Sequence, residues 1–533
     1  MNRFLSLRSI WMLLCLAGCL MTLGCQPDSR TAEAIRAQAS GTQTPAPATP
    51  TATLPTRAST LTPPPTFTPS PDPSAAAPSL EITTTPTITM APAVTNNFRA
   101  QQPMLGVALV ELDEANGLEQ GLDLGVTWMR RAEPLSWEAV EPTEGTYHWE
   151  ALAKLEGELL NAKDRSVQPI IEIQFTPKWA RVTTTHACSA IRTDKFAAFA
   201  DFVEQVVTRY GPASPYGVRY WQLGNELDVA PNEVWATAPF GCWGDPTDPY
   251  YGGGHYADML KVVYPRIKAA DPEAQVLMGG LLLECDPATM TVPDTCRSQQ
   301  RWQSGKFLKG ILHAGGGDYF DIADVHSYAY FTPTLPAQMH SYYAWSGSTG
   351  GTGLPEKVTF VQGLLTQYGL TKPVFVGEAA LKCYAPVNAG DPPLNACWEA
   401  AAAFVPRAYA EGYSLNVIGQ VYYLLLTDVV KYSMLASDFS PRPMYTAYKF
   451  MSSYLENARF ERAVTEYPGL SGSMLIQEGV RPFQIVWSTD GLTQTISIPA
   501  KFVRAFDKYG APLEPMSDTL AIGWSPIYIE LTP

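Results

Sequence analysis

The stretch Val218–Asp228 reads V-R-Y-W-Q-L-G-N-E-L-D. Its short apolar run contains aromatic and β-branched residues, as in a buried strand, and ends at Gly224. Asn225 and Glu226 follow at once, although packing gives no reason for an amide and a carboxylate where a strand leaves the core. A carboxyl group at the end of a rigid strand can act as a general acid, and the neighbouring amide can hold a hydroxyl group. The pattern therefore predicts a second carboxylate at the end of another strand.

Apolar runs of this kind recur from Met104 onward and alternate with helical patterns. Residues 196–210 carry apolar side chains at helical spacing before Gly211-Pro212 ends the helix, and Pro443–Leu455 forms a later helical pattern. This alternation is the signature of parallel β/α units, so the sequence predicts an α/β fold, a (β/α)8 TIM barrel. The eight predicted strands are Leu105–Val110, Thr127–Arg130, Pro169–Phe175, Arg219–Leu223, Gln275–Leu281, Ile322–Val325, Pro373–Val376 and Val417–Tyr423.

The composition changes on both sides of the predicted barrel, which we assign to residues 99–458. Residues 459–533 consist of short apolar runs broken by Gly, Pro and Asp, which predicts a small, sandwich-like C-terminal β domain. Residues 26–98 are dominated by Thr, Pro, Ala and Ser. Such a segment cannot bury enough apolar surface to fold, so we expect a disordered tether.

Residues 1–25 have the pattern of an export signal. Two arginines precede an apolar run that is too short for an ordinary membrane span. Leu16–Cys19 and Thr22–Cys25 both resemble the lipobox of bacterial lipoproteins, in which the Cys is lipidated. Lipidation at Cys19, lipidation at Cys25 and simple secretion all stay open. We expect an extracytoplasmic protein, secreted or held on a bacterial cell surface, whose contact with a membrane is limited to that lipid anchor.

Charge and cysteine content narrow the possible partners and the compartment. The formal net charge is −14 and the pI is about 5.0, which argues against nucleic acid as a partner because phosphate binding needs clustered cations. Beyond the export signal six cysteines remain, an even number that fits disulfides in an oxidising compartment. The absence of any C-x-x-C spacing makes a zinc site the weaker interpretation. The sequence leaves the connectivity open, and the pairs we favour are Cys188–Cys242, Cys285–Cys296 and Cys383–Cys397.

The C-terminal ends of the strands surround the active site of such a barrel. Reading those ends gives two glutamates on non-adjacent strands, Glu226 and Glu378. The second strand ends at Arg130 or Arg131, and we favour Arg130 because the other arginine would point to the helix layer. Paired glutamates in such company are typical of sugar cleavage, in which one carboxyl group is protonated and the other ionised. The other candidates at strand ends are Trp179, Asn225, His326, Tyr328 and Tyr422.

Several of these segments resemble clan A of the glycoside hydrolases, barrels with the acid/base and the nucleophile on the fourth and seventh strands. The matching segments are W-Q-L-G-N-E-L-D, F-V-G-E-A and V-H-S-Y, and G-V-T-W-M-R-R resembles the second β/α unit of the clan. Within the clan the chain is most similar to family 39, which includes β-xylosidases and α-L-iduronidases. The resemblance extends from about Leu105 to the C-terminus, because a small β domain after the barrel is common there.

The resemblance implies a retaining glycosidase with Glu226 as acid/base and Glu378 as nucleophile. It implies a β-linked oligo- or polysaccharide as partner, and no metal or organic cofactor. The clan usually carries a Trp as a sugar platform at the end of the eighth strand; this chain has V-Y-Y-L-L-L-T-D there, so Tyr422 is the expected substitute. The other implied roles are a hydroxyl contact for Asn225, a bond from Tyr328 to the nucleophile, a pocket position for His326 and an ion pair of Arg130 with Glu378.

Alternatives remain for individual residues and for the function. His326 is equally well explained as a core histidine. The tryptophans in the loops after strands either stack on sugar rings or pack the loops. The alternative function is a surface carbohydrate-binding lipoprotein whose barrel has lost activity; the presence of both glutamates favours the enzyme. The loop tryptophans are Trp179, Trp235, Trp243, Trp345 and Trp398.

Overall fold

The computed structural model describes residues 104–284, 304–331, 339–341, 351–384, 393–477, 479 and 481–533. The predicted export signal, the tether, the Cys285–Cys296 pair and Trp345 lie outside these residues. No described helix is both long enough and apolar enough to cross a membrane.

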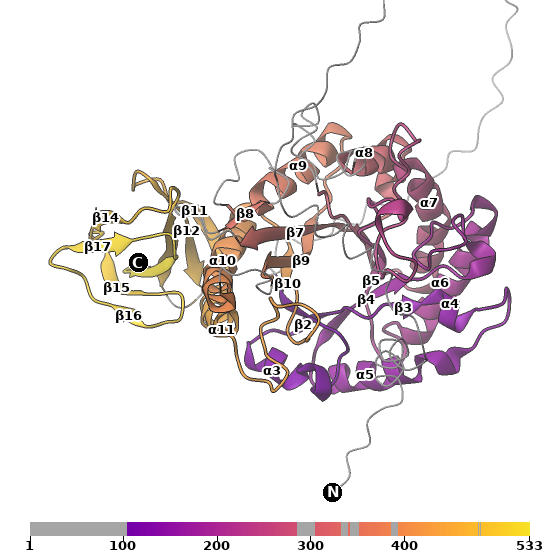
Figure 1. Ribbon diagram of the computed structural model, residues 1–533, viewed down its shortest axis with the longest axis horizontal. Helices are drawn as coiled ribbons and strands as arrows, with labels where there is room; N and C mark the ends of the chain where they lie inside the picture. Colours follow the sequence, from indigo (N-terminus) through magenta and orange to yellow (C-terminus); the bar gives the residue numbers. More distant parts are fainter. Residues whose placement is uncertain are drawn as a thin grey trace, which may run out of the picture. The chain divides into compact units, whose positions relative to one another are not determined.

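Within the described residues, eight parallel strands and their helices form a barrel, as predicted (Figure 1). The hydrogen-bonded order is β6-β5-β4-β2-β1-β10-β9-β7, and the parallel bridges Leu277–Ile322 and Leu281–Val325 join the two ends of this row. Two short strands, β3 (Leu135–Ser136) and β8 (Met339–Ser341), pair with β4 and β7. The barrel strands are β1 (Met104–Leu109), β2 (Trp128–Arg131), β4 (Gln168–Gln174), β5 (Tyr220–Asn225), β6 (Gln275–Gly280), β7 (Ala323–Phe331), β9 (Val374–Lys382) and β10 (Gly419–Tyr422).

Helices lie around the strands, and the two helices expected from apolar spacing are present as α6 and α11. The helices are α3 (Leu118–Asp123), α4 (Trp137–Val140), α5 (Ala153–Asp164), α6 (Phe196–Tyr210), α7 (Gly253–Ala270), α8 (Gly305–His313), α9 (Leu354–Gln367), α10 (Leu394–Ser414) and α11 (Pro443–Leu455). Short 3-10 turns are η2 (Glu114–Asn116), η3 (Trp149–Leu152), η4 (Lys178–Ala180), η5 (Thr193–Lys195), η6 (Pro231–Glu233) and η10 (Gly316–Asp318).

Strands β7 and β9 extend further than predicted. The sequence predicts Ile322–Val325 and Pro373–Val376, whereas the ladder between them continues to the pair Tyr330–Lys382. The predictions stopped where polar residues begin, but alternating polar residues on a strand can face inward. His326 and Glu378 are therefore register partners inside one ladder rather than residues of the loops beyond it.

The barrel interior is layered because side chains of a strand alternate between its two faces. An apolar cluster that includes Ile170 and Tyr220 fills the interior, and the ring of Trp128 packs against Tyr220 with centroids 4.6 Å apart. Two residues further along the same three strands, the inward positions are polar: Arg130, Glu172 and Gln222. This polar layer positions the site described below.

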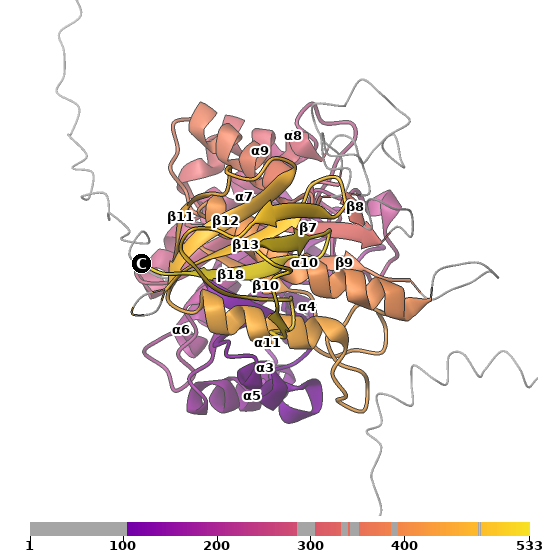
Figure 2. The same cartoon turned by 90° about the vertical axis from the view of Figure 1, so that its left-hand side faces the viewer.

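In the described C-terminal region an antiparallel sheet has the order β11-β12-β13-β18-β15-β16, and β14 pairs with β17 separately. Figure 2 looks onto the larger sheet, with β11, β12, β13 and β18 side by side. The strands are β11 (Ala458–Ala463), β12 (Leu470–Gln477), β13 (Pro482–Ser488), β14 (Gln494–Ser497), β15 (Phe502–Phe506), β16 (Pro512–Leu513), β17 (Thr519–Ile522) and β18 (Ile527–Leu531).

The two faces of the larger sheet pack on different cores. Ile485 and Trp487 of β13 belong to the main core with the barrel, whereas Val486 between them packs with β14 and β17 residues. The hydroxyl of Ser473 donates to the carbonyl oxygen of Ala410 in α10 (2.9 Å). The sheet is thus sandwiched between α10–α11 and the small β14–β17 sheet, in agreement with a C-terminal β domain.

Candidate active site

The carboxyl ends of β5, β7 and β9 bring three titratable side chains together. One oxygen of Glu226, one oxygen of Glu378 and one ring nitrogen of His326 all lie within 4.8 Å of one another. All three residues are buried, with Glu226 the most accessible at 9% exposed. The two predicted glutamates therefore meet at the end of the barrel where active sites of this fold lie.

Glu226 owes its position to the turn that ends β5. Gly224 has φ +88° and Glu226 has φ +47°, so the chain turns through left-handed conformations directly after the strand. A Cβ atom at position 224 would lie 2.6 Å from Leu227 Cδ2, which excludes larger residues. The Glu226 amide donates to the Gly280 carbonyl oxygen (2.6 Å). A left-handed glutamate is uncommon and costs of order 1–3 kcal/mol, and such strained residues cluster at functional sites.

Glu378 is surrounded by hydrogen-bond donors. Its Oε1 accepts a bond from Arg130 Nη1 (2.8 Å) and its Oε2 accepts one from the hydroxyl of Tyr328. Both donors are buried. Donors of this kind stabilise a carboxylate in its ionised form. The predicted contacts of Arg130 and Tyr328 with Glu378 are present.

Arg130 also connects Glu378 to the predicted Asn225 and to two side chains that the sequence analysis missed, Glu172 and Gln222. Its Nη2 donates to Glu172 Oε2 (2.8 Å) and Asn225 Oδ1 (3.2 Å), and its Nε donates to Gln222 Oε1 (2.8 Å). Burial lowers the pKa of Arg130, but the charges of Glu378 and Glu172 outweigh it and the net pKa is raised. The guanidinium therefore stays charged in the interior of the barrel.

Two further carboxyl groups lie near Arg130, and burial changes their titration. Burial raises the pKa of Glu172 to about 8, and it raises the pKa of Asp324 to about 8. Burial thus favours the protonated form of both groups near neutral pH. The signal for Glu172 was present in Q-P-I-I-E-I-Q, where a glutamate interrupts an apolar strand and must find a buried partner.

The neighbouring Arg131 points the other way. Its Nε donates to Glu158 Oε2 (2.7 Å) in α5, outside the barrel. Alternation along β2 thus places Arg130 in the site and Arg131 in the helix layer.

His326 is the neighbour of Glu226. Its Nδ1 lies 3.1 Å from Glu226 Oε1 and 3.5 Å from Glu378 Oε2. Burial lowers the pKa of His326 to about 3, so the imidazole is neutral near pH 7. Because Nε2 has no polar partner among the described residues, the proton is assigned to Nδ1, which donates toward Glu226. A Cβ atom at position 280 would lie 2.1 Å from His326 Nε2, so the imidazole can take this position only because residue 280 is glycine.

At the end of β10 the structure turns Tyr423, rather than the predicted Tyr422, toward the interior of the barrel. Tyr422 is fully buried in the layer facing the helices, and its hydroxyl donates to the Tyr432 carbonyl oxygen (3.0 Å). Tyr423 packs with the interior cluster, and its ring lies 6.3 Å from that of Tyr328. The two tyrosines face opposite ways because a shift of one residue reverses the face of a strand. A sugar contact for Tyr422 stays a prediction.

Trp179 lies in η4, where its partners are structural. Its ring meets that of Trp137 edge-on at 5.2 Å, and its indole N–H donates to the Glu141 carbonyl oxygen (3.0 Å). Neither partner belongs to the cluster around Glu378. A sugar contact for Trp179 stays a prediction.

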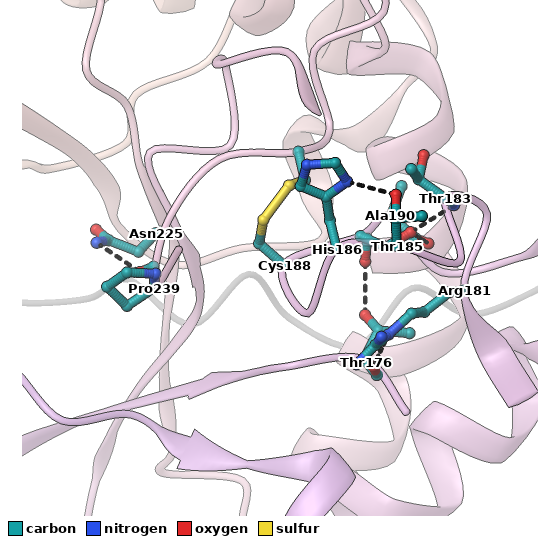
Figure 3. The surroundings of a disulfide bond; sticks show 11 residues. Thr176, Arg181, Thr183, Thr185, His186, Cys188, Ala190, Asn225 and Pro239 are labelled. Carbon is teal, nitrogen blue, oxygen red and sulfur yellow. Dashed lines mark hydrogen bonds between the residues drawn. A yellow bond between two sulfur atoms is a disulfide. The ribbon is translucent and has the colours of Figure 1, made fainter. Parts of the chain in front are cut away.

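A disulfide joins the loops that follow β4 and β5. Cys188 and Cys242 are bonded, as expected. Figure 3 shows this disulfide together with Asn225, whose Nδ2 donates to the Pro239 carbonyl oxygen (3.4 Å). The crosslinked loop therefore borders the residue next to Glu226. The expected bond between Cys383 and Cys397 is also present, and both disulfides fit an extracytoplasmic location.

Among the described residues, one group of side chains has the spacing to hold a metal ion: Glu226, His326 and Glu378. Both oxygens of Glu378 already accept bonds, and one of the donors is the guanidinium of Arg130. A buried cation 2.8 Å from Glu378 repels a metal ion at this position. The donor set suits proton transfer better than metal binding.

Comparison with known proteins relates this chain to others through its fold. No protein-family model and no curated protein matches the sequence. A family 39 glycoside hydrolase from Bacteroides cellulosilyticus WH2 has a similar structure, with a TM-score of 0.57 and 21% identity over 81% of each chain. The fold is that of clan A glycoside hydrolases.

Two other solved structures match at lower identity. A family 30 endoxylanase from Clostridium papyrosolvens C71 gives a TM-score of 0.50 at 11% identity, covering 81% of this chain and 97% of its own. An endo-β-1,6-glucanase gives a TM-score of 0.50 at 12% identity, covering 81% of this chain and 92% of its own. These likenesses concern the fold.

Proposed function

We propose that this protein is a retaining glycoside hydrolase that cleaves a β-linked oligo- or polysaccharide. The observation that carries the proposal is the approach of Glu226 and Glu378, whose nearest oxygens lie within 4.8 Å. Retaining enzymes hold their carboxyl groups about 5–5.5 Å apart, whereas inverting enzymes need about 6.5–9.5 Å to admit a water molecule. The short separation supports double displacement.

In the first step Glu378 attacks the anomeric carbon while Glu226 protonates the departing glycosidic oxygen. A bond forms between Glu378 and the sugar as the glycosidic bond breaks. In the second step Glu226 takes a proton from water, and the resulting hydroxide displaces Glu378 from the sugar. Arg130 and Tyr328 stabilise Glu378 as an anion before the attack and again when it leaves.

Asn225 lies where it could hold the hydroxyl next to the anomeric carbon, since Arg130 orients its amide. The inward-facing Tyr423 is our candidate for the sugar platform. The export signal and the tether of residues 26–98 suggest that the enzyme acts outside the cell or, through a lipid on Cys19 or Cys25, on its surface.

Replacement of either glutamate tests the proposal. We expect Glu378→Ala to lower kcat on an activated aryl β-glycoside by on the order of 10⁵-fold, because no covalent intermediate forms. Glu226→Ala should lose about 10²–10⁴-fold, because proton transfer is lost. Azide should restore turnover of Glu226→Ala by replacing the water that needs a base. The substrate is first identified with a panel of aryl glycosides and plant polysaccharides.

The matched control is Glu273→Ala, an exposed glutamate before β6 at the opposite end of the barrel. It should retain wild-type rates. The proposal fails if both active-site variants retain them too. NMR of the early product gives a second check, since double displacement on a β-linked substrate releases the β-anomer and an α-anomer would exclude it.

A further inference from the structure

A short segment after β6 is held from two sides by buried charged residues. The carboxylate of Asp228 accepts hydrogen bonds from the amides of Leu282 (2.9 Å) and Leu283 (2.7 Å). The ammonium group of Lys357, in α9, donates to the Leu282 carbonyl oxygen (2.7 Å). The same ammonium group donates to the carbonyl oxygen of His326 (2.9 Å). Side chains thus hold the backbone of Leu282 and Leu283, directly after the residue that pairs with β7, Leu281.

Both side chains are removed from solvent. Asp228 is 1% exposed and Lys357 is 4% exposed. Burial raises the pKa of Asp228 to about 7 and lowers the pKa of Lys357 to about 8. Burial of such groups is strongly unfavourable unless they are paired and hydrogen-bonded. A packing role alone would be met at lower cost by apolar side chains.

Lys357 and Asp228 are connected to the proposed acid/base, Glu226, through hydrogen bonds of the backbone. Lys357 binds the backbone of His326, whose Nδ1 lies 3.1 Å from Glu226 Oε1. Asp228 is two residues beyond Glu226, and the Glu226 amide donates to Gly280 at the end of β6. The backbone of His326 also bonds to this segment, since its amide donates to the Leu281 carbonyl oxygen (2.8 Å). One hydrogen-bonded frame therefore connects α9, β6 and β7 around Glu226.

We propose that Lys357, together with Asp228, is a positioning residue for the acid/base Glu226 and acts through the backbone of His326 and the Leu281–Leu283 segment. The inference rests on the proposed function. Neither residue touches Glu378, whose two oxygens are held by Arg130 and Tyr328. Loss of the frame should therefore impair proton donation to the leaving group and spare the nucleophile.

The test compares substrates that differ in their need for a proton. Lys357→Met removes the ammonium group and retains the length of the side chain. We expect kcat/KM for the phenyl glycoside of the cleaved sugar, which needs the acid, to fall by about 10²-fold. For the 2,4-dinitrophenyl glycoside, whose leaving group departs without a proton, kcat/KM should stay within about threefold of wild type. Retained cleavage of the dinitrophenyl substrate also shows that the variant is folded.

Lys372→Met is the matched control. Lys372 also donates to a buried backbone, at the Phe320 carbonyl oxygen (2.8 Å), but it precedes β9 at the other end of the barrel. It should change both rates equally or not at all. If Lys357→Met does not fold, the milder Lys357→Gln is assayed with the same two substrates.

Equal losses on both substrates for the Lys357 variant would overturn the inference, because a general structural role affects both steps alike. That outcome is distinct from a failure of the proposed function. The proposed function fails if the wild-type protein hydrolyses no glycoside or if Glu226→Ala shows no preference for the dinitrophenyl substrate.

Discussion

Glu378 and Glu226 belong to one hydrogen-bonded cluster, yet their surroundings differ in charge and in backbone. On the Glu378 side, the carboxylate lies inside β9 and accepts bonds from a buried guanidinium and a hydroxyl group. On the Glu226 side, the residue follows β5 in a left-handed conformation and faces an imidazole that burial keeps neutral. One side stabilises an anion, and the other presents a neutral imidazole. Two identical side chains are thus suited to different roles by their neighbours.

The largest effect is expected on the Glu378 side, from Arg130→Met. This change leaves Glu378 buried without its cation, which should lower the free energy of unfolding by about 3–5 kcal/mol. Hydrolysis should also fall by about 10²–10³-fold, as when a preorganised donor is removed. Thermal unfolding and kcat, measured below the Tm of the variant, give the two quantities.

The neighbouring arginine supplies the control. Arg131→Met breaks the pair with Glu158 outside the barrel, so it should reduce Tm but leave kcat of the folded protein within about threefold. Similar losses of kcat in Arg130→Met and Arg131→Met would show that the effect on kcat does not come from the contact of Arg130 with Glu378.

A smaller effect is expected on the Glu226 side, from Gly280→Ala. The added methyl group would lie 2.1 Å from His326 Nε2, so the imidazole must move away from Glu226. We expect a loss of about 10–100-fold in kcat/KM, as for a displacement of about 1 Å in an active site. Gly157→Ala is the control, since its Cβ in α5 meets nothing within 4 Å and should add about 0.5–1 kcal/mol of stability. An unchanged kcat/KM in Gly280→Ala would mean that His326 does not position Glu226.

The smallest effects concern the two tyrosines of β10. Tyr423→Leu removes the proposed sugar platform beside Tyr328 and should raise KM by about 2- to 10-fold. Tyr422→Phe removes the bond to the Tyr432 carbonyl oxygen, which should cost about 1 kcal/mol of stability without changing KM. Steady-state kinetics and thermal unfolding check both; the reverse pattern would put Tyr422 in the pocket.

The barrel could be predicted because each strand is a short apolar run between helical patterns. Parallel strands then bring their ends together, so that Glu226 and Glu378 could be paired although 152 residues separate them in the printed numbering. The pair Cys383–Cys397 was favoured because the two residues are close in sequence, and Cys188–Cys242 as a pair across two loops; both are confirmed.

What the sequence could not supply depends on the orientation of side chains and on burial. Tyr422 was chosen over Tyr423 because the end of a strand does not reveal which face its last residues occupy. Arg130 donates hydrogen bonds to Glu378, Glu172 and Asn225. These contacts depend on which inward-facing residues of different strands lie at the same height in the closed barrel. The neutral state of His326 follows from burial, and burial of one residue is a property of the whole fold.

Strand β18 comes later in the sequence than the other strands of its sheet, yet it lies between β13 and β15. The ribosome therefore releases β11, β12 and β13 before the strand that completes their pairing exists. Until residue 531 has emerged, the apolar faces of Ile485 and Trp487 lack part of the sheet that orders them against α10. A chain whose translation stops before β18 will expose this surface to chaperones and proteases. Production of the protein therefore depends on the last strand, although β18 contributes no residue to the candidate active site.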